Sequence, residues 1–276
     1  MSTRSKVWWW IGGVLIVIYC LFPIAWIVSL SLKAPADVSN SSFLPTSATW
    51  SNYEEIFTGT ASDLFLPALR NSFGICLIAT FISCLLSMFA AYAIARLDFP
   101  GKRLILSTAL AVAIFPVISI VTPLFNVWRQ IGLYDTWLGL IIPYLSLTLP
   151  ISIWTMSAFF REIPWEMEHA AQVDGATQWQ AFRKVIAPLA GPGVFTTAII
   201  TFFTAWNDFV FAISLTSGNA RTVPAALSFF TGASQFTQPT GAIAAAAVIV
   251  TIPVIILVLI FQRRIVSGLT SGAVKG

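Results

Sequence analysis

Six apolar segments, each long enough to cross a lipid bilayer as a helix, constrain this sequence more than any other feature. A helix needs about 20 residues to cross a hydrocarbon layer about 30 Å thick. The segments lie at about 7–31, 71–95, 104–128, 137–160, 190–215 and 241–262. The first is also longer than the core of a cleaved signal peptide. The sequence therefore predicts an all-α integral membrane protein with six transmembrane helices in a single domain over residues 1–276.

The composition agrees with burial in lipid and argues against other classes of protein. Charged residues make up 9% of the chain and hydrophobic residues 57%, whereas soluble domains carry about 25% charged residues. The basic residues gather at the ends of the apolar segments, where they would meet lipid headgroups, so the net charge of +4 does not indicate nucleic-acid binding. Cys20, Cys76 and Cys84 lie inside predicted spans without a CxxC pair, so we expect no metal site.

The distribution of Lys and Arg predicts the orientation in the membrane. If both termini are cytoplasmic, the external loops contain only four basic residues, Lys33, Arg70, Arg129 and Arg221. An excess of positive charge in the cytoplasmic loops is typical of membrane proteins. We therefore expect both termini in the cytoplasm, with a cytoplasmic tail over 263–276.

The longest cytoplasmic segment, 161–188, is also the most charged part of the chain and predicts two short helices. Residues 165–173 favour the first helix, and the Asp-Gly pair that follows would break it. Thr177 and Gln180 have the spacing of a capping box at the start of the second helix. A helix of about ten residues is marginal in isolation. A partner must therefore hold it, either the rest of this chain or a separate cytoplasmic protein.

Within this segment, EMEHAAQVDGATQWQAFRKVIAPLAGPG resembles the EAA loop of binding-protein-dependent ABC importer permeases in residue types, in spacing and in its position before the penultimate span. In that family the loop forms a coupling helix that docks into a cleft on an ATP-hydrolysing subunit. The resemblance assigns ATPase coupling to Glu168, His169, Ala170, Ala171, Asp174 and Gly175. The chain departs from the family pattern at His169, which occupies the position of the family's Glu, while Glu168 lies one residue earlier. His169 is either a charge that tunes docking near neutral pH or an ordinary polar surface residue.

The resemblance covers nearly the whole chain and extends to carbohydrate permeases. AYAIARLDFPGKR after the second span, AWNDFVFAISL in the fifth and the C-terminal QRRIVSGLTSGAVKG are similar to segments of the smaller permeases of maltose importers. Within this subgroup the chain resembles the smaller permease of mycobacterial trehalose importers. The resemblance implies a type I ABC importer permease fold in a bacterial inner membrane, and a disaccharide substrate for which trehalose is the best match.

The resemblance also implies a set of partners. They are a second homologous permease, two ATPase subunits that bind ATP and Mg²⁺, an extracytoplasmic sugar-binding lipoprotein, the sugar itself and membrane lipid. This chain contains no GxxxxGK[ST] phosphate loop. We therefore expect it to be a transport subunit with no catalytic residue and no cofactor of its own, and no nucleic acid as a partner.

A polar cluster in the fifth predicted span is the candidate substrate path. Asp208 is the only acidic residue well inside a predicted span, and Trp206 and Asn207 adjoin it. Ionisable groups in hydrocarbon usually face a cavity or a partner. An aromatic face, an amide and a carboxylate together suit the C–H faces and hydroxyls of a sugar. The alternative is a polar cluster that fixes helix packing against the second permease.

The second external loop, 216–240, has two interpretations as well. By the resemblance it would enter the external binding protein, where Gln235, Thr237 and Gln238 could compete with the sugar for hydrogen bonds. The alternative is a flexible connector between the last two spans.

Three other functions stay open from the sequence. An ion-driven secondary transporter would need ionisable relay groups inside the spans, where Asp208 stands nearly alone. A lipid-modifying enzyme would need a cluster of His, Asp or Glu at the membrane interface, and the single histidine, His169, lies in the cytoplasmic segment. A scaffold that only anchors partners would show no sugar flux.

Overall fold

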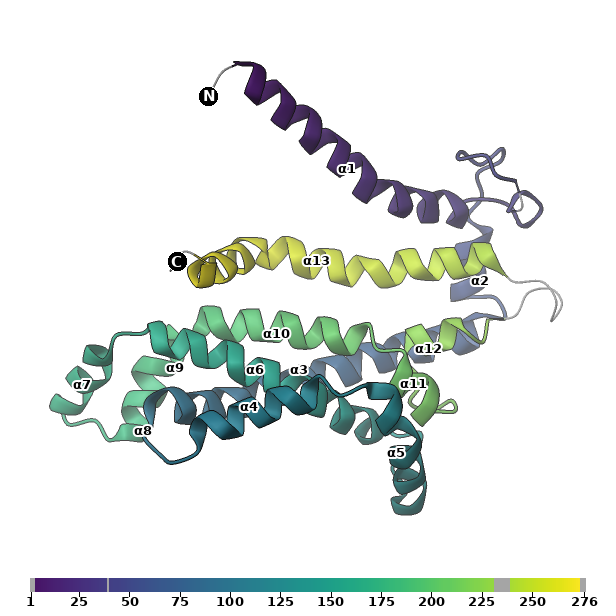
Figure 1. Cartoon of the computed structure of the whole chain (residues 1–276). Coiled ribbons are helices and arrows are strands. Elements are labelled where there is room, and N and C mark those ends of the chain that lie inside the picture. Colours follow the sequence, from purple (N-terminus) through teal and green to yellow (C-terminus); the bar gives the residue numbers. More distant parts are fainter. Residues whose placement is uncertain (1–2, 39, 231–238, 274–276) are drawn as a thin grey trace. The chain divides into compact units, whose positions relative to one another are not determined.

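The computed structural model describes residues 3–38, 40–230 and 239–273, with side chains for 7–38, 40–230 and 239–261. This part of the chain is helical, and its extended pairing is limited to an isolated bridge between Lys33 and Ala48. The prediction of an all-helical protein is confirmed. Figure 1 shows the elements: α1 (Thr3–Ser31), η1 (Pro35–Asp37), α2 (Ser51–Phe57), α3 (Ser62–Arg96), α4 (Lys102–Ala113), α5 (Val117–Ile131), α6 (Trp137–Glu162), α7 (Trp165–Val173), α8 (Gln178–Ala181), η2 (Phe182–Ile186), α9 (Ala187–Leu189), α10 (Gly191–Trp206), α11 (Val210–Leu215), α12 (Val223–Leu227) and α13 (Thr240–Ala273).

Within the described residues, four single helices are long and apolar enough to cross a membrane. They are Val7–Ser31, Ser62–Arg96, Trp137–Glu162 and Thr240–Phe261. Two further candidates are bent pairs: Lys102–Ala113 with Val117–Ile131, at 89°, and Gln178–Leu189 with Gly191–Trp206, at 68°. If each bent pair is one span, the total is up to six, which is the predicted number, although the second pair covers 178–206 instead of the predicted 190–215.

The predicted third and fifth spans are not continuous helices. The third is interrupted at Pro116, which caps α5 in an extended conformation (φ −61°, ψ 118°). A proline disfavours helical geometry in the residue before it and has no N–H to donate, so α4 ends short of Pro116 and α5 leaves at a steep angle (Figure 1). The fifth is interrupted between the end of α10 at Trp206 and the start of α11 at Val210.

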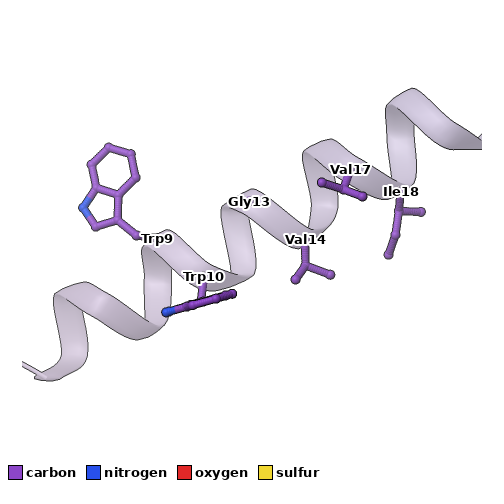
Figure 2. Close-up of a pocket in the computed structure, with 6 residues that line it drawn as sticks. All are labelled: Trp9, Trp10, Gly13, Val14, Val17 and Ile18. Atoms are coloured by element: carbon purple, nitrogen blue, oxygen red, sulfur yellow. The ribbon is translucent and has the colours of Figure 1, made fainter. Parts of the chain in front are cut away.

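The chain divides into two compact units. One contains residues 1–69 and 226–253, and the other contains 70–225 and 254–276. The first unit includes α1, whose side chains are exposed from Val7 to Val28 with few exceptions. Six α1 residues, Trp9, Trp10, Gly13, Val14, Val17 and Ile18, line a shallow hollow on this one helix (Figure 2). A hollow formed by one helix alone presents apolar surface to lipid or to another protein and contains no polar site.

A buried lysine organises the turn after α1 in the same unit. Lys33 is fully buried, and its Nζ donates to the carbonyls of Asn40 (2.7 Å) and Ser42 (2.8 Å). Asn52, from α2, donates to the carbonyls of Ser31 and Lys33. These bonds satisfy backbone carbonyls that a loop would otherwise leave buried and unpaired. The short helix α2 is thus joined to the end of α1 by side-chain hydrogen bonds.

Three helices of the second unit are joined by hydroxyl groups. Ser83 on α3 donates to Ser152 on α6 (3.2 Å), and Ser152 pairs with Thr201 on α10 (3.0 Å). Thr148, one turn from Ser152, also donates to Ser83 (3.3 Å). Small hydroxyl residues let helices approach closely in a membrane and bond across the contact. An apolar cluster extends the packing towards α7: Ala91, Met156, Phe160, Phe182, Ile186 and Ala190.

We predict that Gly74→Ala destabilises the second unit. A Cβ at Gly74 would lie 2.2 Å from Cη2 of Trp137, whose indole N–H donates to Asn71 (3.0 Å). The indole would have to move, so we expect a loss of about 1–3 kcal/mol. Thermal unfolding of the purified protein in detergent measures the effect. Gly12→Ala on α1, where a Cβ meets nothing within 4 Å, is the control, and equal midpoints for the two variants would contradict the prediction.

Candidate functional site

The helix predicted over 165–173 is present with those bounds, as α7 (Trp165–Val173). Glu168 is the one buried residue of α7, at 3% exposure. His169, Ala170 and Gln172 are exposed, Ala171 is half-buried, and Val173 is 87% exposed. The helix therefore presents nearly its whole surface outward, including small and apolar side chains.

The turn after α7 explains why glycine occupies position 175. Gly175 has φ +87°, a left-handed conformation that other residues adopt at a cost. Its N–H donates to Gln172 O, and the N–H of Ala176 donates to Ala171 O, both at 3.0 Å. This pair of bonds is a Schellman motif, which satisfies the last carbonyls of the helix. Asp174, the C-cap residue, is exposed.

The predicted capping box is confirmed in the next helix. Thr177 N–H donates to the Gln180 side chain (2.8 Å), and Gln180 N–H donates to the Thr177 hydroxyl (3.3 Å). The chain then passes from α8 into a π-helical turn, η2, which begins at Phe182. Phe182 is 4% exposed, and its ring centroid lies 4.6 Å from that of Tyr92 on α3. The coupling segment is thus tied to the membrane helices at its second half.

Glu168 and His169 have opposite surroundings although they are adjacent. The Glu168 carboxylate accepts a hydrogen bond from the Tyr92 hydroxyl and lies 4.0 Å from Nε of Arg96. The His169 ring is exposed and lies 6.1 Å from the Trp165 ring, between centroids. Among the residues assigned to coupling, Glu168 therefore contacts α3 of the same chain, whereas His169 is exposed on the surface.

The structure does not bring the three predicted path residues together on one surface. Trp206 is 3% exposed and packs against Phe73 and Phe202, with ring centroids 4.9 and 5.1 Å away. Asn207 is exposed at the end of α10. Asp208 lies between α10 and α11, two residues before α11 begins at Val210.

Asp208 closes the break between α10 and α11. Its carboxylate accepts the N–H groups of Phe211 (3.3 Å) and Ala212 (3.0 Å) and the hydroxyl of Tyr144 from α6 (3.0 Å). A carboxylate at a helix N-terminus satisfies free backbone donors and interacts favourably with the helix dipole. This geometry holds the interrupted helix together and joins it to α6.

The sequence reasoning missed a polar stripe on α5. Ser119, Thr122, Asn126 and Gln130 are exposed, whereas Trp128 on the same helix is buried. Their spacings of three, four and four residues place them on one face of a helix. That spacing was readable in the sequence, but the interpretation of 104–128 as one apolar span obscured it.

A second missed residue is Asp135, in the turn between α5 and α6. Its carboxylate accepts the backbone N–H groups of Ser217, Gly218, Asn219 and Ala220 at 3.0–3.1 Å, and the Ser217 hydroxyl at 2.8 Å. It therefore fixes the first residues of loop 216–240. A lone Asp in a polar turn gives little sequence signal for this role.

Loop 216–240 also has partial helical structure. It contains α12, and Asn71 on α3 donates to the carbonyls of Asn219 (2.9 Å) and Arg221 (3.0 Å). The predicted binding-protein contacts, Gln235, Thr237 and Gln238, lie outside the described residues. Among the described side chains, no group of three His, Cys, Asp or Glu could hold a metal ion.

Comparisons with known proteins agree with this architecture. Residues 83–271 match the family model described as "Binding-protein-dependent transport system inner membrane component". The chain is 57% identical to "Trehalose transport system permease protein SugB" of Mycobacterium tuberculosis, over 100% of both chains. It is 38% identical to "Trehalose/maltose transport system permease protein MalG" of Thermococcus litoralis, over 96% of this chain and 95% of that one. The structure resembles a subunit in the crystal structure of a bacterial ABC transporter for alginate import, with TM-score 0.77, 23% identity, and coverage of 95% and 98%.

We predict that Asp135→Asn loosens the start of loop 216–240. Burial by itself raises the pKa of Asp135. Together, the hydrogen bonds from Ala220, Asn219, Gly218 and Ser217 lower the pKa by more than burial raises it, so the pKa falls to about 2. An asparagine loses the charge and turns one oxygen into a donor. Hydrogen bonds to charged groups contribute about 1.5–3 kcal/mol, so we expect the amides of residues 217–220 to exchange with solvent at least about tenfold faster.

The pH dependence follows from the same lowered pKa. A carboxylate with a lowered folded pKa stabilises the loop fully above its unfolded pKa of about 4, and loses that contribution as the pH falls through about 2. Hydrogen exchange of residues 217–220 should therefore keep constant protection above about pH 4 and lose protection below it. Asp63→Asn, an exposed aspartate in α3, is the control. Unchanged protection in Asp135→Asn would contradict the assignment.

Proposed function

This chain belongs to the family of binding-protein-dependent transport system inner membrane components, and from that premise we propose that it is a permease subunit of an ATP-driven sugar importer. It forms half of the translocation path for a disaccharide. The proposed sugar is trehalose, because two relatives of full or nearly full length carry trehalose in their names. The proposed partners are a second homologous permease, two ATPase subunits that bind ATP and Mg²⁺, and an extracytoplasmic binding lipoprotein.

The outward surface of α7 is the observation that carries the proposal. A helix of nine residues is too short to be stable in water without a partner. Here it is fixed at its end by the Gly175 turn and held from inside by Glu168, yet its small and apolar residues stay exposed. We assign docking on the ATPase to His169, Ala170, Ala171, Asp174 and Gly175, with Glu168 as the internal anchor.

Docking of this kind lets a soluble subunit drive a membrane helix. When the ATPase pair closes around ATP, α7 moves together with the ATPase cleft in which it is docked. The spans attached to α7 then tilt, and the cavity between them changes from inward-facing to outward-facing. ATP drives the change only if it binds the closed state more tightly. Reversing a strongly biased equilibrium requires about 5.5 kcal/mol of differential binding.

The proposed path runs along polar groups that are not used for packing. Asn207 and three residues of the α5 stripe, Ser119, Thr122 and Asn126, are exposed amides and hydroxyls in segments expected to lie in the membrane. Polar residues at membrane depth usually face a water-filled cavity or a partner. Asp208 keeps the α10–α11 break in place beside them, while Trp206 supports the core.

Orientation and the external contact are parts of the same proposal. Both termini and the tail 263–276 are placed in the cytoplasm because most Lys and Arg then lie on that side. Loop 216–240 then faces outside, where Asp135 and Asn71 hold its start and Gln235, Thr237 and Gln238 meet the binding protein.

Affinity purification of the chain in mild detergent tests the assembly. Recovery of a second permease and an ATPase, with hydrolysis stimulated by a trehalose-loaded binding protein, is the expected result. Uptake of labelled trehalose, in competition with unlabelled maltose, then tests the sugar. Recovery of this chain alone, with uptake that an uncoupler abolishes and ATP depletion does not, would favour an ion-driven transporter instead.

Two substitutions on the coupling segment test the role of α7. Gly175→Pro cannot adopt φ +87° and removes the N–H that bonds to Gln172, and Ala170→Arg adds a long charged side chain to the exposed face. We expect both to reduce uptake to background while the chain reaches the membrane in normal amounts. Gly175→Asn, which tolerates the left-handed conformation, and Ala170→Ser are the matched controls. Normal uptake in Gly175→Pro and Ala170→Arg would refute the coupling role.

A further inference from the structure

We propose that Arg96 and Tyr92, at the end of α3, are positioning residues that lock α7 to the membrane helices through Glu168. The inference rests on the proposed function, because it concerns how movement of the coupling helix reaches the spans. It assigns a role to Arg96, one of the basic residues at the ends of the apolar segments. It also assigns Glu168 to internal transmission instead of contact with the ATPase.

Arg96 joins three helices at one point. It is the last residue of α3 and is 7% exposed. Its Nη2 donates to the carbonyls of Phe160 (2.8 Å) and Ile163 (2.5 Å), at the end of α6. Its guanidinium carbon lies 4.4 Å from the ring centroid of Trp165, the first residue of α7. A planar guanidinium can bond to carbonyls and stack on an aromatic ring at the same time.

Tyr92 and Arg96 present two groups to one carboxylate. They are four residues apart on α3, so they lie on the same face of that helix. The Tyr92 hydroxyl donates to Oε1 of Glu168 (2.5 Å), and Nε of Arg96 lies 4.0 Å from Oε2. The Tyr92 ring itself packs against Phe160 and Phe182, with centroids 5.9 and 4.6 Å away.

Burial makes this contact costly to open. The side chains of Arg96 and Glu168 are 1% and 4% exposed, so each charge depends on the other for compensation. Removing one partner of such a pair leaves an uncompensated buried charge. Separating α7 from α3 would likewise leave the buried charges of Arg96 and Glu168 without compensation. We infer that α7, α3 and the end of α6 move together, so that a force on α7 reaches two membrane spans directly.

The two charged side chains are close but are not hydrogen-bonded to each other through Nε of Arg96 and Oε2 of Glu168. Nε of Arg96 and Oε2 of Glu168 are both buried, and neither has a hydrogen-bond partner among the described side chains. Shortening their 4.0 Å separation would satisfy a buried donor and a buried acceptor at once. A side-chain adjustment that closes this separation would therefore strengthen the contact.

The test measures coupling in the full transporter, as sugar taken up per ATP hydrolysed. The variants are Arg96→Gln, Glu168→Gln and Tyr92→Phe, and the control is Glu162→Gln, an exposed carboxylate at the end of α6. We expect the ratio to fall about tenfold in Arg96→Gln and Glu168→Gln, a change within the usual range of coupling between sites. Hydrolysis itself and recovery of the ATPase with the chain should persist. Glu162→Gln should keep the wild-type ratio.

Two further variants separate positioning from simple stability. The double variant Arg96→Gln/Glu168→Gln should be no worse than either single change, because it leaves neither charge unpaired. Arg96→Lys keeps the charge but lacks the planar guanidinium that stacks on Trp165 while it bonds to the Phe160 and Ile163 carbonyls, so its ratio should lie between wild type and Arg96→Gln. If Arg96→Gln does not reach the membrane, the ratio measured for Tyr92→Phe is used to test the proposal, because this variant removes one hydroxyl and keeps the ring packing.

Each outcome is decisive. Wild-type ratios in Glu168→Gln and Tyr92→Phe would overturn the proposal, and so would a parallel loss of uptake and hydrolysis with an unchanged ratio. Failure of the wild-type chain to recover an ATPase would instead refute the proposed function. A lowered ratio with the ATPase still bound supports the positioning role.

Discussion

Backbone hydrogen bonding in hydrocarbon is the constraint on which this structure depends. A peptide group in lipid has no water to bond with, so a spanning segment must satisfy its own N–H and C=O groups as a helix. The breaks in the helices are therefore the places where other groups must compensate. Pro116 removes a donor where α5 begins, and the Asp208 carboxylate accepts two N–H groups where α11 begins. Both breaks lie in segments that would otherwise have been uniform helices, and both create exposed polar positions near them.

The same principle explains how the second unit is held together. Apolar side chains gain little from one another in a lipid environment, so close packing and hydrogen bonds between helices carry more of the specificity. The Ser83–Ser152–Thr201 chain joins α3, α6 and α10. Asp135 ties the start of loop 216–240 to the turn between α5 and α6, and Asn71 ties it to α3. Polar contacts thus mark each place where a loop or a helix end must hold its position.

The coupling segment combines an outward surface with internal anchors. Phe182 fixes its second half by apolar packing, and Glu168 fixes α7 by a buried polar contact with α3. A segment that only displayed a docking surface would absorb a push from its partner by bending. In the proposed coupling role, anchoring at two points would transmit the same push to the spans.

Local patterns in the sequence were sufficient for the all-helical class, the bounds of α7, the break at Gly175 and the capping box at Thr177. Each depends on residues within a few positions of one another, so no knowledge of distant segments is needed. The sequence could not decide which way a side chain faces when its partners lie far along the chain. Trp206 was expected at the path and packs in the core, and Glu168 was expected at the docking face and is bound by residues more than 70 positions away. Only tertiary structure brings Tyr92, Arg96 and Glu168 together, because a buried charge is stable only where the fold supplies its partner.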